Sequence, residues 1–158
     1  MENDKRDRAA AMDRLSPFVG EWTVEVGFAP GMTVPTVFEW ILGGHFLVQR
    51  TEVPDPNAPD SMMVIGADDD GDGYTQHYFD SRGIARLYAM TFDDGVWTLR
   101  REAPDFTPLG FTPLGFHQRF TGTFGDDGRT IRGTFENSHD DGATWEPDFE
   151  ITYRKAGS

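Results

Sequence analysis

The sequence predicts an all-β protein: an antiparallel up-and-down β-barrel of about ten strands, with a short helix at its N-terminus. Two observations predict it. Apolar and polar residues alternate in about ten short segments, and turn-forming Gly and Asp residues separate most of those segments by only a few positions. Hairpins in series favour a barrel, because closure pairs the edges that an open sheet exposes. A β-sandwich is the alternative architecture.

The helix is expected within residues 1–16. Ala9, Ala11, Met12 and Leu15 share one helical face, and Ser16-Pro17 ends the pattern. A short amphipathic helix of this kind is expected to pack across one end of the barrel.

The strands follow one another along the rest of the chain. Trp22, Val24 and Val26 alternate with polar residues, and so do Phe38 and Trp40. Turns are expected where Gly or Asp-Gly sequences interrupt the pattern. The predicted strands are 22–28, 36–42, 45–53, 62–67, 74–80, 84–92, 96–102, 116–124, 130–136 and 145–154.

Residues 1–158 are predicted to form a single domain, a length that can bury a real core. One loop is unusual, because Phe-Thr-Pro-Leu-Gly occurs twice in succession over residues 106–115. Two prolines in ten residues forbid a regular central strand. We interpret 103–115 as a loop lengthened by duplication, either a flap over the barrel mouth or a neutral insertion.

Composition limits the function classes. The net charge of −13 disfavours nucleic acid as a partner, since an acidic surface repels phosphates. The absence of cysteine excludes disulfides and thiolate chemistry. Residues 1–15 lack the apolar core of a signal peptide, and no apolar run is long enough to span a membrane. The sequence therefore predicts a soluble, cytoplasmic protein.

Two short motifs are interpreted as turns. Asp68-x-Asp70-x-Asp72-Gly73 resembles the start of a calcium loop, but Phe79 stands where that loop needs a bidentate Glu. An acidic hairpin turn is favoured there. The residues Ser138, Asp140, Gly142 and Trp145 have the spacing of an Asp-box, which is a structural hairpin in other β proteins.

Asp80 and Arg82 are open to two interpretations. The sequence Asp80-Ser81-Arg82-Gly83 is typical of an Asx turn closed by Gly, and it is also compatible with a charge pair at a pocket rim. The four histidines have no zinc-ligand spacing, and no metal site is expected.

Polar and aromatic residues within the strands are the candidates for a site. Alternation alone does not say which face of a strand lines the interior. The candidate acid–base residues are His77, Tyr78, Arg86 and Glu39. The candidate ligand-binding residues are Trp40, Arg50, Tyr88, Gln118, Phe120 and Tyr153. An inward Arg beside a Tyr would suit a carboxylate or a phenolate.

Four segments carry a resemblance to an uncharacterised bacterial family of calycin-like barrels. They are 15–22 (LSPFVGEW), 43–47 (GGHFL), 78–83 (YFDSRG) and 145–149 (WEPDF). The resemblance implies a ten-stranded lipocalin-like barrel related to the fatty-acid-binding and nitrobindin-like proteins, and no agreed activity. It also implies that Trp22 lies at the barrel base under Arg154 in a cation–π contact.

Haem binding is implied only by the nitrobindin-like part of that resemblance. Nitrobindin-like proteins hold haem through a late-strand His and carry Gly-x-Trp-x-Gly-x-Gly. Here Gly20-Glu-Trp22 continues without the next two glycines in register, and the late His139 lies in a predicted turn. No cofactor is therefore expected, with haem kept as an alternative.

Three functions are compatible with these observations. The favoured one is binding of a small, largely apolar ligand with a carboxylate or hydroxyl group inside the barrel. The alternatives are a cofactor-independent cyclase, isomerase or decarboxylase acting on a small hydrophobic substrate, and nitrobindin-like haem binding. Each is compatible with a homodimer formed through the barrel walls.

Overall fold

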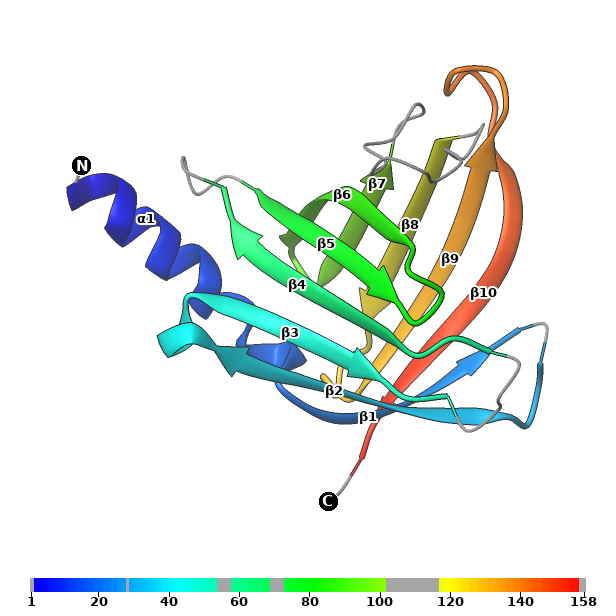
Figure 1. The fold of residues 1–158 in the computed structure, drawn as a ribbon, viewed down its shortest axis with the longest axis horizontal. Helices are drawn as coiled ribbons and strands as arrows, with labels where there is room; N and C mark the ends of the chain where they lie inside the picture. Colours follow the sequence, from blue (N-terminus) through cyan, green and yellow to red (C-terminus); the bar gives the residue numbers. More distant parts are fainter. Residues whose placement is uncertain (1, 28, 54–57, 69–72, 102–116, 157–158) are drawn as a thin grey trace.

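The computed structural model describes residues 2–27, 29–53, 58–68, 73–101 and 117–156, and the side chains from Asp7 onward. They form a closed, ten-stranded antiparallel barrel with one N-terminal helix, as predicted (Figure 1). The elements are α1 (Glu2–Asp13), η1 (Ser16–Phe18), β1 (Gly20–Val26), β2 (Thr33–Ile41), η2 (Leu42–Gly44), β3 (Phe46–Thr51), β4 (Ser61–Ala67), β5 (Tyr74–Asp80), β6 (Ala85–Asp93), β7 (Val96–Arg101), β8 (His117–Phe124), β9 (Thr130–Ser138) and β10 (Glu146–Lys155).

Each strand pairs with its neighbours in the sequence, and β1 pairs with β10 to close the barrel. Trp22, for example, lies opposite Thr36 of β2 on one side and opposite Lys155 of β10 on the other. Closure excludes the β-sandwich. The duplicated loop at 103–115, and Asp70 and Asp72 of the acidic turn, lie outside the described residues.

Alternation along each strand divides the wall into an inner and an outer face. In β5, Tyr74 and Gln76 are buried, whereas His77 and Phe79 are exposed. Cross-strand register carries the same division around the barrel, because residues directly opposite one another share a face. The face of every strand residue discussed below follows from this register.

One end of the barrel, the base, is closed by aromatic side chains. Phe18 of η1 is fully buried, and its ring lies 4.9 to 5.3 Å from those of Phe38, Phe92, Trp97 and Phe124. These centroid separations are typical of favourable aromatic pairs. The helix α1 lies at this end as well, and Tyr74 of β5 donates a 2.6 Å hydrogen bond to the Ala11 carbonyl.

The tryptophan of the Gly20-Glu-Trp22 segment is buried in this base. Its Nε1 donates a 2.7 Å hydrogen bond to the Phe18 carbonyl. The prediction of a contact with Arg154 is wrong, because alternation directs Arg154 outward, where it lies 4.0 Å from Glu25. Lys155, one residue later, points inward instead, and its Nζ lies 5.4 Å from the Trp22 ring centroid.

Two inward-facing glycines make room for the ring of Phe120. A Cβ on Gly133 would lie 2.2 Å from Phe120 Cε2, and a Cβ on Gly122 would lie 2.8 Å from its Cζ. Gly122 and Gly133 are register partners on β8 and β9. The ring therefore lies flat over two adjacent strands, at a place where neither strand carries a side chain.

Candidate functional site

A row of polar side chains crosses the inner face of β5 to β9, between the aromatic base and the opposite end of the barrel. Register places Gln76 opposite Tyr88, Arg101 opposite Gln118, and Gln118 opposite Asn137. We call this row the polar belt, and its members are Gln76, Tyr88, Arg101, Gln118 and Asn137. Such a row inside a barrel is unusual, since buried polar groups are costly unless they are hydrogen-bonded.

The belt is buried, and part of its hydrogen-bonding capacity is unused. Gln76 and Arg101 are each 1% exposed. Tyr88 donates a 2.9 Å hydrogen bond to Gln118 Oε1. The buried oxygens Gln76 Oε1 and Asn137 Oδ1 have no hydrogen-bond partner among the described residues. Since such oxygens are normally paired, the belt can accept hydrogen bonds from a bound molecule.

A second polar group lies on the inner face of β2, β3 and β10. Gln49 Nε2 donates to Thr36 Oγ1 at 3.3 Å and to the Tyr153 hydroxyl at 3.4 Å. Thr36 Oγ1 also donates to the Arg50 carbonyl at 3.0 Å. We call Thr36, Gln49 and Tyr153 the Gln49 cluster.

A third group lies at the end of β5, at the rim away from the base. The Asp80 side chain is fully buried, and Oδ2 accepts hydrogen bonds from Tyr78 at 2.9 Å and from Arg82 Nη2 at 2.6 Å. Its Oδ1 accepts from the Arg82 amide at 2.9 Å. Asp80 therefore closes an Asx turn and forms a rim charge pair at once, so both interpretations of this segment hold.

The rim carboxylate stays ionised. Burial alone opposes ionisation, but the hydrogen bonds from the Arg82 side chain, the Tyr78 hydroxyl and the Arg82 amide together hold the Asp80 pKa below its usual value. Arg86 Cζ lies 5.8 Å from the Tyr78 ring centroid. Since Arg82 neutralises Asp80, Arg86 adds positive charge to the inner face near this rim.

Two tyrosines have strongly raised pKa values. Burial, and then the hydrogen bond to Asp80, raise the pKa of Tyr78 to about 12. Burial raises the pKa of Tyr153 to about 12, against a smaller opposing effect of its hydrogen bond with Gln49. Both phenols are therefore neutral at physiological pH, and neither can act there as a base.

These shifts predict a loss of stability at alkaline pH. Between pH 10 and about 12 the unfolded chain loses tyrosine protons that the folded chain keeps, so the unfolded state gains as pH rises. The contribution is fully present below the unfolded pKa of 10.0 and is lost through the folded pKa. Urea unfolding across this range should show the decline. In the Tyr78→Phe/Tyr153→Phe double variant the decline should be shallower, and an unchanged decline would contradict the assignment.

The structure separates the predicted site residues into two sets. Seven of them lie on the inner face: Trp40, Tyr78, Arg86, Tyr88, Gln118, Phe120 and Tyr153. Three lie on the outer face: Glu39, Arg50 and His77. Glu39 and Arg50 form an ion pair there, and the exposed His77 ring stacks on Phe79. These three do not join the others in the interior.

Four interior polar residues were not among the predicted site residues: Gln49, Gln76, Arg101 and Asn137. Each occupies an inward position in its strand. The available signal was register: once the hairpins are aligned, polar residues fall at one level on five consecutive strands. A single strand does not show it, because alternation does not identify the buried face.

A histidine-ligated haem does not fit the described interior. Register directs His77 and His117 outward, and His45 and His139 lie in exposed segments outside the strands. His117 Nε2 lies 3.4 Å from Asp141 Oδ1 at the outer rim. An axial ligand must point at the iron, so no step is derived through haem. Within the described residues no three His, Cys, Asp or Glu side chains are grouped to hold a metal ion.

The Asp-box is a structural turn on the outside of the barrel. Asp140 Oδ1 accepts hydrogen bonds from the Thr144 amide and from Ser138 Oγ, both at 2.8 Å. The hydrogen bonds from Thr144 and then from Ser138 lower the pKa of Asp140 to about 2. Arg119 Cζ lies 4.2 Å from the Trp145 ring centroid and ties this turn to the outer face of β8.

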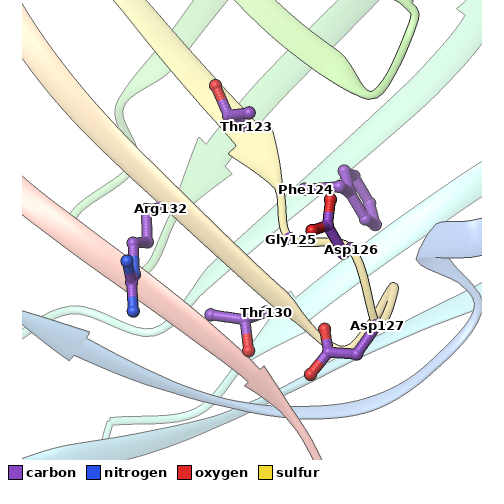
Figure 2. Close-up of a pocket in the computed structure, with 7 residues that line it drawn as sticks. All are labelled: Thr123, Phe124, Gly125, Asp126, Asp127, Thr130 and Arg132. Atoms are coloured by element: carbon purple, nitrogen blue, oxygen red, sulfur yellow. The ribbon is translucent and has the colours of Figure 1, made fainter.

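Surface hollows lie away from the interior polar groups. Figure 2 shows one of about 460 Å³ beside the β8–β9 turn, where the Asp126 and Asp127 carboxylates lie near Thr130. Asp127 Oδ1 accepts a hydrogen bond from the Arg129 amide at 2.9 Å, which is ordinary turn chemistry. Another hollow, of about 700 Å³, lies between α1 and η2. Neither is lined by the polar belt.

Comparison with known proteins supports the fold and goes no further. No protein-family model matches the chain, and no curated protein matches it. Among solved structures, the crystal structure of Rv2717c from M. tuberculosis matches with a TM-score of 0.61 at 15% identity, over 93% of this chain and 98% of that one. Similarity at this identity shows a shared barrel fold alone. None of the described helices is long and apolar enough to cross a membrane.

Proposed function

We propose that this protein binds a small, largely apolar carboxylate inside the barrel. The carboxylate would lie at the polar belt, and the apolar body would lie against the aromatic rings toward the base. Binding sites of this kind are mostly apolar with a few placed polar groups. A ten-stranded barrel encloses a wider interior than the eight-stranded barrels that side chains alone can fill.

The observation that carries this proposal is the buried Arg101 within the belt. Its residue is 1% exposed in a chain whose net charge is −13. Among the inward-facing strand residues that the structure describes, Arg86 and Arg101 are cationic away from the base, and Asp80 is the one carboxylate, already paired with Arg82. The excess positive charge inside the wall favours an anionic group, and a guanidinium can bind a carboxylate through two hydrogen bonds.

Two measurements test the proposal. Native mass spectrometry of the purified protein, before and after denaturation, should reveal a co-purifying organic acid. Calorimetry with decanoate, a simple apolar carboxylate, should show binding that saturates at one ligand per chain. If neither a co-purifying acid nor decanoate binding is found, the proposal is wrong.

Arg101→Met is predicted to weaken decanoate binding at least about tenfold, because it removes a charge-assisted hydrogen bond in a buried setting. The neighbouring Arg100→Met is the matched control. Arg100 lies on the same strand but faces outward, toward Trp145. Equal losses in the two variants, or none in either, would contradict the role assigned to Arg101. Thermal unfolding of both variants checks that the fold is kept.

A further inference from the structure

The orientation of the Gln49 amide is fixed by its neighbours. Thr36 has one hydroxyl proton, and it goes to the Arg50 carbonyl. Thr36 Oγ1 can therefore only accept from Gln49, so the group facing it is the NH2. That NH2 uses its second proton on the Tyr153 hydroxyl. Gln49 Oε1 must point elsewhere.

This oxygen is left as an unused acceptor. Gln49 is 2% exposed, and its Oε1 has no hydrogen-bond partner among the described residues. A buried unpaired acceptor costs free energy that a suitable donor would recover.

An unused donor lies in the same part of the interior. Trp97 is 1% exposed, and its Nε1 has no hydrogen-bond partner in the described part of the chain. Its ring centroid lies 5.8 Å from that of Tyr153, whose hydroxyl contacts Gln49. Tyr153 therefore has the unused acceptor of Gln49 on one side and the unused donor of Trp97 on another.

We infer that the ligand carries a hydroxyl group at the end opposite its carboxylate, and that this hydroxyl binds between Gln49 and Trp97. A hydroxyl group donates one hydrogen bond and accepts others, so it can donate to Gln49 Oε1 and accept from Trp97 Nε1. A methyl group at the same place would leave both buried atoms unpaired. The inference rests on the proposed function, because it concerns the deep end of the same bound molecule.

The two polar ends of this ligand are a defined distance apart. Trp97 and Arg101 lie on the same face of β7, four residues apart, which corresponds to about 13 Å along a strand. The class indicated is an elongated, apolar hydroxy acid with its two polar groups at opposite ends. ω-Hydroxydecanoate has this form, and decanoate is the same molecule without the hydroxyl.

The test is calorimetric titration of the protein with ω-hydroxydecanoate and with decanoate. We expect ω-hydroxydecanoate to bind about tenfold more tightly, the effect of satisfying two buried groups less the cost of removing the ligand hydroxyl from water. In Gln49→Met, which keeps a side chain of similar length without the acceptor, the preference should fall to about onefold or reverse. The outer-face variant Glu39→Gln should keep the wild-type preference.

The possible failures are distinguishable. If decanoate binds and ω-hydroxydecanoate binds no better, the inference is overturned and the proposed function stands. If neither binds, both are overturned. A preference that survives Gln49→Met overturns the assignment to this residue.

A spectroscopic measurement guards against a poorly folded variant. In the wild-type protein, the indole N–H resonance of Trp97, assigned with Trp97→Phe, should shift downfield more with ω-hydroxydecanoate than with decanoate. Equal shifts would overturn the inference without reference to Gln49→Met.

Discussion

Replacing Phe18 by alanine is expected to lower the free energy of unfolding by about 3–5 kcal/mol. Phe18 is fully buried, and four aromatic rings surround it at the base. Its removal would leave a hole at the point where η1 closes the barrel, and rings anchored on four different strands cannot collapse to fill it. Urea unfolding followed by tryptophan fluorescence measures the change.

The matched control is Phe79→Ala. Phe79 is 40% exposed on the outer face of β5, with its ring stacked on His77. Its loss should cost about 1 kcal/mol or less, since little is buried there. If the two variants lost similar stability, the base would not be the packed closure that the ring geometry indicates.

Gly133→Ala is expected to destabilise the barrel by about 2–3 kcal/mol, a large effect for the addition of one methyl group. The new Cβ would lie 2.2 Å from the Phe120 ring, with Ile151 Cγ2 at 3.3 Å beside it. Phe120 cannot move away freely, because its ring also packs 4.8 Å from that of Phe135 and 4.9 Å from that of Trp97.

Compensation distinguishes this cause from a general dislike of alanine in a strand. In the background Phe120→Leu, the additional cost of Gly133→Ala should fall below about 1 kcal/mol, because the atoms that clash are absent. Gly125→Ala is the matched control, with its nearest contact an ordinary 3.4 Å to Asp127 Oδ1. Additive losses in the double variant would show that the Phe120 ring is not the obstacle.

The fold could be predicted because its signals are local. Ten alternating segments and the turns between them predict hairpins, and hairpins in series leave few topologies. The contact of Trp22 with Lys155 was missed for a different reason. The resemblance suggested Arg154, but the face of a residue near a strand end depends on the register of β1 with β10, which joins the two ends of the chain.

The interior was only partly predictable for the same reason. Tyr78, Tyr88 and Gln118 were recognised as polar residues within strands, but so were His77, Glu39 and Arg50, which lie outside. The sign of a face is a tertiary property: one residue of shift in register exchanges the two faces. The polar belt exists only as an alignment of five strands, and no single segment contains it.

The pairing of β1 with β10 has a consequence for how the protein is made. Every other strand pair is complete once two consecutive strands have left the ribosome, so the wall can grow hairpin by hairpin. The enclosed interior, however, does not exist until Ile151 to Lys155 reach β1. A chain ending before Glu146 would be a curved open sheet with two unpaired edges, and its polar belt and aromatic base would both face water. The binding site is therefore the last part of the molecule to form, and it forms all at once.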